Sequence, residues 1–265
     1  MRCSFVDHLS REISITYPPQ RIISLVPSQT ELLFDLGLDD HIIGVTKFCI
    51  YPAKKVKNRA KVGGTKKLNI GLIDELHPDL IIANKEENEL EQIQLLMQKF
   101  PVWVSDIANL ADAIQMINDV GQLTNTVTKA SAITSDIQNA FSTLSPIKKA
   151  FSVAYLIWQE PFMIAAKHTY IDDMLTRCGF ANAFEQNRYP VVTHEDLIDA
   201  NPDIVMLSSE PYPFKQKHVN LFQTILPQAK VILVDGEMFS WYGSRLLLAV
   251  DYFKQLIDNV SITRF

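Results

Sequence analysis

One stretch of this chain occurs twice, and the repeat constrains the fold more than any single residue does. Residues 75–86 read Glu-Leu-His-Pro-Asp-Leu-Ile-Ile-Ala-Asn-Lys-Glu, and residues 199–210 read Asp-Ala-Asn-Pro-Asp-Ile-Val-Met-Leu-Ser-Ser-Glu. Pro78 and Pro202 lie 124 positions apart, and the same spacing relates Asp79 to Asp203. Such self-similarity is typical of repeated structural units. We therefore expect two similar halves, with a binding site where they face each other.

Each copy predicts the end of a helix followed by a buried strand. Proline after the last helical turn blocks the helix and favours extended backbone before it. The four apolar residues that follow form a continuous run, which is typical of a strand buried on both faces of a parallel sheet. We expect strands at 12–16, 21–26, 42–46, 80–83 and 102–105, then at 150–157, 204–207 and 231–234, with a final helix at 242–257.

A second correspondence supports the repeat. Residues 31–38 and 173–180 each read as an amphipathic helix that is stopped by glycine, at Gly37 and Gly179, and followed by an apolar residue. Glycine is the common residue just past a helix because it adopts positive φ at little cost. The two halves therefore share this unit as well.

The stretch from about residue 110 to residue 144 has a different character. It contains no proline, and apolar residues recur at helical spacing from Ala130 to Leu144. After a break near 121–125, this pattern predicts one helix of roughly 20 residues. The predicted fold is α/β: two similar Rossmann-like lobes with mainly parallel sheets, joined by one long helix, with a ligand cleft between them. We expect an N-terminal lobe at 1–108, the inter-lobe helix at 109–146 and a C-terminal lobe at 147–265.

Composition limits the partners. The formal charge of −5 argues against nucleic acid, and no window of eighteen apolar residues predicts a membrane span. The first residues lack the apolar core and cleavage site of a secretory signal. Three widely spaced cysteines fit a reduced compartment without a disulfide framework. We expect a monomer whose partner is a small molecule.

Aromatic and cationic side chains follow several predicted strands. Trp158 and Trp241 lie at the carboxyl ends of the first and last strands of the second half, where open α/β sheets bind ligands, and Tyr242 comes next. Their rings predict flat ligand contacts; the alternative is packing in the core. Lys47 and Arg245 suit an anionic ligand, because arginine makes bidentate contacts and lysine supplies a point charge. The alternative for both is a solvated surface charge.

The chain contains no glycine-rich phosphate loop and no G-x-S-x-G motif, and it has only nine glycines. Its six histidines show no metal-binding spacing. We therefore expect a non-catalytic binding protein, without a metal or cofactor, that clamps a small flat or chelate ligand. A cytosolic enzyme or chelate-handling protein with the same two-lobed fold is the alternative.

These features resemble a known family. The resemblance is carried by residues 21–32 (Arg-Ile-Ile-Ser-Leu-Val-Pro-Ser-Gln-Thr-Glu-Leu), by 44–46, 51–52 and 161–162, by both repeat copies and by 239–245. Over about residues 21–256 the chain resembles the helical-backbone substrate-binding proteins of ABC importers, in particular the vitamin B12-binding proteins and their iron-chelate-binding relatives. The resemblance implies a ligand that is a corrinoid, haem or an iron chelate.

The resemblance also implies particular contacts. In the B12-binding relatives an aromatic floor holds the corrin ring, and Arg245 matches an arginine at the edge of their cleft. The matching aromatic residues of this chain are Tyr51, Phe162, Tyr189 and Phe239. Two tryptophans of that pocket fall on Thr65 and Asn84 here, so a ligand other than cobalamin stays open.

The family resemblance further implies a permease partner and a periplasmic location. In these proteins one glutamate per lobe, at the start of the helix before the repeated Pro-Asp, pairs with arginines of the permease. The second half has Glu195 there, whereas the first half has Gly71. Losing one such pair weakens docking rather than forbidding it. Without a signal in these residues, a cytoplasmic location is the alternative.

Overall fold

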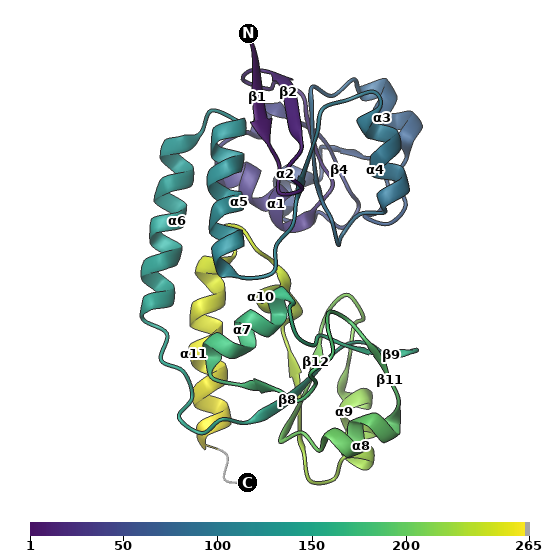
Figure 1. Ribbon diagram of the computed structural model, residues 1–265, viewed down its shortest axis with the longest axis vertical. Helices are drawn as coiled ribbons and strands as arrows, with labels where there is room; N and C mark the ends of the chain where they lie inside the picture. The colour runs from purple at the N-terminus through teal and green to yellow at the C-terminus, as the bar shows by residue number, and fades with distance from the viewer. Residues whose placement is uncertain (263–265) are drawn as a thin grey trace. The chain divides into compact units, whose positions relative to one another are not determined.

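The structure, a computed structural model, describes residues 1–262 and consists of two compact units (Figure 1). Unit 1 comprises Met1–Ile107, Ala111–Gln138 and Tyr242–Arg245. Unit 2 comprises Ala108–Leu110, Asn139–Trp241 and the chain from Leu246 onward. The domain limits expected from the sequence, 1–108, 109–146 and 147–265, stay a prediction.

Unit 1 is built on a five-stranded parallel sheet with the order β5-β4-β3-β6-β7. Its strands are β3 (Ile22–Ser24), β4 (Ile42–Val45), β5 (Ala60–Lys61), β6 (Leu80–Asn84) and β7 (Val102–Ser105). Figure 1 shows α3 and α4 on one side of this sheet and α5 on the other. Because helices cover both faces, every residue of β6 is buried, as its continuous apolar run predicts.

Helices connect and follow the strands of this part of the chain. They are α1 (Pro27–Asp35), a short 3-10 turn η1 (Asp39–His41), α2 (Ala53–Val56), α3 (Ile70–Leu76), α4 (Leu90–Met97), α5 (Leu110–Leu123) and α6 (Val127–Ser142). Ile73 of α3 and Ile93 of α4 pack against Ile23, Ile81 and Val102 of the strands. The sheet face toward α3 and α4 is therefore a continuous apolar core.

The helix predicted after the break near 121–125 is α6, which has 16 residues. The preceding helix, α5, ends where Asn125 adopts a left-handed conformation with φ of 58°. A Cβ on Gly121 would lie 2.4 Å from the Cβ of Ala130. Glycine at this position therefore lets α5 and α6 approach each other closely.

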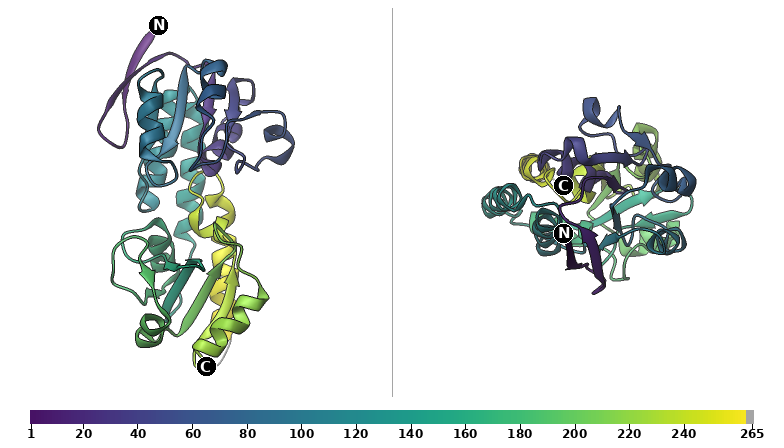
Figure 2. Two further views of the ribbon diagram at one scale, coloured as in Figure 1. Left: turned by 90° about the vertical axis from the view of Figure 1, so that its right-hand side faces the viewer. Right: turned by 90° about the horizontal axis from the view of Figure 1, so that it is seen from above.

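An antiparallel hairpin of β1 (Arg2–Val6) and β2 (Glu12–Thr16) precedes the unit 1 sheet, and Figure 2 shows it standing out from the rest of the unit. The limits of β2 agree with the prediction, whereas β1 was not predicted. The Asp7 carboxylate accepts the backbone N–H groups of Leu9 (3.0 Å) and Arg11 (2.9 Å), which forms the turn between the strands.

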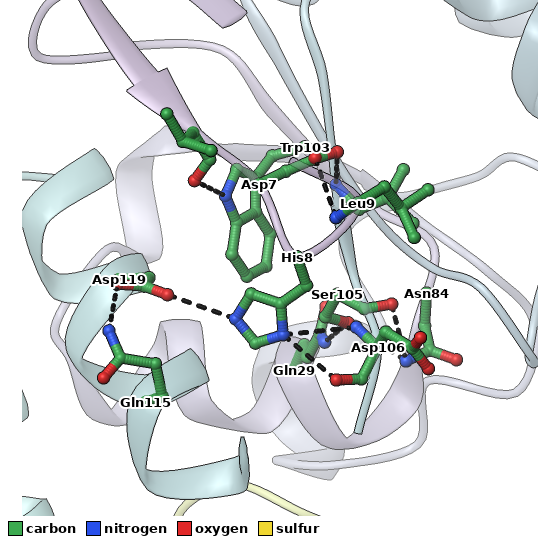
Figure 3. A network of polar contacts seen from close by, with 12 residues as sticks. Asp7, His8, Leu9, Gln29, Asn84, Trp103, Ser105, Asp106, Gln115 and Asp119 are labelled. Atoms are coloured by element: carbon green, nitrogen blue, oxygen red, sulfur yellow. Dashed lines mark hydrogen bonds and ion pairs between the residues drawn. The ribbon is translucent and has the colours of Figure 1, made fainter. Parts of the chain in front are cut away.

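His8 ties this hairpin to α5 (Figure 3). Its Nε2 lies 3.1 Å from Asp119 Oδ2, and its Nδ1 lies 3.1 Å from the carbonyl oxygen of Asp106. The ring packs edge-on to Trp103, with ring centres 5.2 Å apart. Burial lowers the pKa of His8, but the hydrogen bonds to Asp119 and Asp106 and the charges of Asp119 and Asp112 outweigh it, so the pKa is raised above 6.5.

Unit 2 contains a six-stranded sheet in the order β11-β9-β8-β12-β13, with β10 beside β8. The strands are β8 (Ser152–Trp158), β9 (Phe162–Ile164), β10 (Ala181–Asn182), β11 (Val191–Val192), β12 (Ile204–Ser208) and β13 (Lys230–Val234). β9 runs antiparallel to both β8 and β11, and the remaining pairs are parallel.

The helices of unit 2 cover both faces of this sheet. They are α7 (Tyr170–Cys178), α8 (His194–Ala200), α9 (Gln216–Ile225), α10 (Gly236–Ser240) and α11 (Leu246–Ile262). Figure 1 shows α8 and α9 on one side and α7, α10 and α11 on the other. The C-terminal helix thus begins at Leu246 rather than at the predicted Tyr242. Gly243, with φ of 131°, is incompatible with a helix at that point.

The sequence repeat is a structural repeat. Helices α3 and α8 each have 7 residues and end in left-handed residues, His77 and Asn201, with φ of 46° and 42°. The five-residue strands β6 and β12 follow. Gly37, one residue past the cap of α1, and Gly179, the cap of α7, are also left-handed, with φ of 84° and 86°. The two halves therefore share both predicted units.

The repeated aspartates hold the start of a neighbouring strand in both halves. Asp79 accepts the backbone N–H groups of Gln20 (2.7 Å) and Arg21 (2.8 Å), just before β3. Asp203 accepts the N–H of Ser152 at 2.8 Å, at the start of β8. Each carboxylate therefore fixes the start of the neighbouring strand, which sets the register of the pair.

Candidate ligand-binding site

The carboxyl ends of parallel strands gather at one edge of a sheet, and open α/β sheets bind ligands there. At this edge of unit 1, Lys47 follows β4 and is exposed, and its backbone N–H donates to Gly63 O at 2.7 Å. Its ammonium lies 4.9 Å from the ring centre of Phe48, which is itself 50% exposed. The end of β4 therefore presents a cation beside an apolar ring.

Tyr51 and Arg245 form a stack in unit 1. The guanidinium carbon of Arg245 lies 4.0 Å from the ring centre of Tyr51. Its Nε and Nη2 donate to the two carboxylate oxygens of Glu31, at 2.7 and 2.8 Å. Burial raises the pKa of Glu31, and the hydrogen bond from Arg245 opposes this rise. Arg245, predicted as an anion contact, is thus buried in an internal ion pair, and we assign it a positioning role.

The residues around Arg245 attach the segment Tyr242–Arg245 to α1. The Ser244 hydroxyl donates to the Asp35 carboxylate. A Cβ on Gly243 would lie 3.1 Å from the carbonyl oxygen of Ser28, so only glycine fits this backbone contact with its positive φ. Tyr242, predicted as a ligand contact, is 5% exposed at the start of this segment.

The ends of β6 and β7 are polar. Asn84 Nδ2 donates to the carbonyl oxygen (3.1 Å) and the hydroxyl (3.0 Å) of Ser105, and Gln29 Nε2 donates to the same hydroxyl at 2.5 Å (Figure 3). Asn88 Nδ2 donates to the carbonyl oxygen of Thr65 at 3.1 Å. Thr65 and Asn84, which the family resemblance pointed to as pocket positions, therefore belong to a buried amide network.

The corresponding edge of unit 2 is aromatic. Trp158 ends β8 and is 39% exposed. Trp241 follows α10 and is 6% exposed; its indole N–H donates to Glu210 Oε1 at 2.7 Å, and the Ser240 hydroxyl donates to the same oxygen at 2.7 Å. Of these two predicted platforms, Trp158 offers far more open ring surface.

The other three predicted aromatic residues differ in how deeply they are buried. Tyr189 is half-buried in the chain before β11. Phe162 in β9 is partly buried, with its ring centre 4.8 Å from that of His194 and 5.2 Å from that of Phe222. Phe239 has no exposed surface and packs on Tyr155, with ring centres 5.1 Å apart. Phe239 is thus a core residue in this structure and is not carried into the proposed site.

The predicted permease contact lies on α8. Glu195 is exposed in the first turn of that helix. Gly71 occupies the same position of α3 and is also exposed. The equivalence that the sequence repeat suggested between these two positions therefore holds in the structure.

Surface hollows, possible metal-binding groups and the length of the apolar helices were compared with the predicted site. Unit 1 has two surface hollows. One, of about 350 Å³, is lined by residues 11–14 and 97–102, and the other, of about 490 Å³, is lined by residues that include 36–38, 41 and 124–129. Neither lining includes a predicted ligand contact. Within residues 1–262, no group of three or more His, Cys, Asp or Glu side chains is arranged to hold a metal ion. None of the helices in that range is long and apolar enough to cross a bilayer.

Two repeated α/β units with cationic and aromatic side chains at the carboxyl edges of their sheets have the features of a substrate-binding protein. The family model described as periplasmic binding protein matches residues 22–223, more than half of the chain, and the chain belongs to this family. The predicted membership in the helical-backbone class is confirmed.

Individual relatives agree with this assignment. The vitamin B12-binding protein of Pectobacterium carotovorum is 27% identical, over 87% of this chain and 86% of its own length. A periplasmic haem-binding protein of Roseiflexus sp. RS-1 has a TM-score of 0.77 at 20% identity, covering 90% of this chain and 98% of its own. The periplasmic vitamin B12-binding protein of Vibrio cholerae gives 0.74 at 21% identity, with 93% and 99% covered. These structural likenesses establish the fold.

Proposed function

We propose that this chain is the non-catalytic substrate-binding component of an ABC importer and that it holds a corrinoid, haem or another iron chelate. The observation that carries the proposal is the family match over residues 22–223, together with a B12-binding relative that aligns with 87% of the chain. A protein of this kind binds and releases its ligand unchanged.

The proposed ligand contacts come from the carboxyl edges of both sheets. In unit 1 they are Lys47 and Tyr51, with the less exposed Tyr242. In unit 2 they are Trp158 and Tyr189, with the less exposed Trp241. Arg245 supports this surface by holding the Tyr51 ring rather than by touching the ligand. Phe162 contributes mainly to packing.

The two edges favour different ligand chemistries. In unit 1 the exposed Lys47 favours an anionic carboxylate substituent, whereas in unit 2 Trp158 favours a flat hydrophobic surface. A haem has a flat ring with carboxylates, and a corrinoid has a ring with amides. Because Thr65 and Asn84 replace two pocket tryptophans of the B12-binding relatives, we rank haem-like ligands equally with corrinoids.

The proposed partner is an ABC permease, and the proposed location is the periplasm, as for the relatives. Glu195 supplies an exposed carboxylate in unit 2, and Gly71 supplies none in unit 1. We therefore expect docking that depends mainly on unit 2. Glu195→Gln should weaken binding to a reconstituted permease and leave ligand affinity unchanged.

The direct test is a binding titration of the purified full chain. Cyanocobalamin, hemin and ferrioxamine B are added separately, and tryptophan fluorescence and probe absorbance are followed. Saturable one-to-one binding of at least one probe supports the proposal. Binding of none of the three, together with turnover of some substrate, would instead support the cytosolic enzyme that the sequence left open.

A further inference from the structure

The loop after β12 adds an aromatic residue that the sequence analysis did not select. Tyr212 lies in this loop, and its backbone N–H donates to Ile157 O near the end of β8 at 3.3 Å. This bond sets the Tyr212 ring beside Trp158, edge to face, with ring centres 5.6 Å apart and planes at 71°. The two rings therefore form an aromatic corner at the carboxyl edge of the unit 2 sheet.

The polar atom of Trp158 is already engaged within the protein. Its indole N–H donates to the carbonyl oxygen of Glu160 at 3.0 Å, which also fixes the orientation of the ring. Because the side chain is 39% exposed, what it offers to a ligand is ring surface without a hydrogen-bond donor.

The Tyr212 hydroxyl is engaged as well. It donates to Gln159 Oε1 at 2.5 Å. His218 Nδ1 accepts the Lys215 N–H at 2.7 Å, so a neutral His218 carries its proton on Nε2. That Nε2 faces the Tyr212 oxygen at 3.4 Å and donates to it. His218 is 3% exposed and packs edge-on to Tyr212 and Phe214, which holds the ring in place.

We propose that Trp158 and Tyr212 form a ring-stacking subsite for a flat conjugated macrocycle of the porphyrin type, and that His218 positions Tyr212 within it. The inference rests on the proposed function and specifies its ligand class. A corner whose polar atoms all bond within the protein gains energy from a flat apolar face. It gains little from a globular hydroxyl-rich or hydroxamate-rich chelate, which needs hydrogen-bond partners.

The positioning role gives a pH dependence. Burial, then the charge of Lys217 on α9 and that of Lys215 just before this helix, hold the pKa of His218 below 6.5, so His218 is neutral at pH 7.5. The rings of Tyr212 and Phe214 also face His218. Protonation at lower pH prevents Nδ1 from accepting the Lys215 N–H. Ligand affinity should therefore fall as pH falls through the pKa of His218.

The test uses the full chain, with protoporphyrin IX and hemin as flat probes and cyanocobalamin and ferrioxamine B as contrasts. Tyr212→Ala should weaken binding of the flat probes about tenfold, as expected for one lost aromatic contact. Tyr212→Phe keeps the ring and should stay within about threefold of wild type at pH 7.5. The matched control is Leu221→Ala on α9, which removes a 39% exposed apolar side chain outside the corner. It should leave the affinity for every probe unchanged.

His218→Asn tests the positioning role separately, because its amide oxygen can still accept the Lys215 N–H but cannot reach Tyr212. We expect an affinity loss of about threefold at pH 7.5 and a flat pH profile, whereas the affinity of the wild type falls as pH falls through the pKa of His218. A pH profile of His218→Asn that matches the wild type would overturn the positioning role.

The outcomes separate this inference from the proposed function. If the wild type binds a flat probe and Tyr212→Ala binds it equally well, the subsite is overturned while the function stands. The same holds if only ferrioxamine B or cyanocobalamin binds, since neither presents an open flat face. If no probe binds, the proposed function fails and the subsite fails with it.

Discussion

Arg245 provides the sharpest test of how the structure differs from the family expectation. The sequence suggests an anion contact, whereas the structure pairs Arg245 with Glu31, with side-chain exposures of 7% and 15%. Arg245→Ala would leave the Glu31 carboxylate largely buried without its cation. Removing one partner of a buried ion pair costs about 3–5 kcal/mol, and the small remaining exposure places this pair at about 3 kcal/mol. The lost stack on Tyr51 adds roughly 0.5–1 kcal/mol.

Urea unfolding at pH 8 measures this loss, and a double-mutant cycle isolates the pair. Glu31→Leu with Arg245→Met should recover most of the stability, because an apolar replacement of both partners leaves no unpaired charge. The loss in Arg245→Ala should also shrink at pH 5. Burial already raises the pKa of Glu31, and without Arg245 it rises further, so acidification protonates the carboxyl and removes the buried charge.

A stability of Arg245→Ala within about 0.5 kcal/mol of wild type would refute the structural role. If such a variant also lost affinity for hemin while Tyr212→Phe did not, Arg245 would be the ligand contact that the resemblance implies. The two roles therefore give opposite patterns in unfolding and binding, and one set of variants distinguishes them.

Three further predictions test the fold. His8→Gln should lower the free energy of unfolding by about 1–2 kcal/mol at pH 5.5 and by less at pH 8.5. Because the pKa of His8 is raised in the folded state, its stabilising effect is complete below pH 6.5 and is lost as pH rises through the raised pKa. Urea unfolding at both pH values checks this. Gly179→Ala should cost about 2–4 kcal/mol, because its Cβ would lie 2.8 Å from Ile147 N, whereas Gly37→Ala meets only a flexible lysine end and should cost about 1–2 kcal/mol in the same assay. In the native protein Cys3 should react fastest with Ellman's reagent, since burial raises the pKa of Cys178 to about 12 and Cys49 is also buried; equal reactivity of all three would contradict the packing.

The repeated unit was predictable because its signals are local. The proline, the aspartate and four aliphatic residues set the end of a helix and the start of a strand within one short segment, and α8 and β12 follow at the expected residues. Tertiary contacts decide the rest. The C-terminal helix starts at Leu246 because Gly243 packs on Ser28, more than 200 residues away in the sequence. No local pattern reveals that contact.

The same distinction applies to the site. Trp158 could be placed at the edge of the sheet because it directly follows a predicted strand. The partner of Arg245 could not be predicted, because Glu31 is 214 positions away. Tyr212 did have a usable signal, since it lies two residues after the second repeat copy. Treating the residues after both copies as edge residues would have included it.

The repeat also suggests why the two edges differ. The shared helix and strand build the same scaffold twice, and the duplicated aspartates fix the same register, so these residues had little freedom to diverge. The strand ends carry no such constraint: β6 ends in Asn84 within an amide network, whereas the chain after β12 brings Tyr212 to Trp158. A porphyrin offers a flat ring to Trp158 and Tyr212, whereas a globular ferric chelate offers none, so the edge of unit 2 favours the porphyrin.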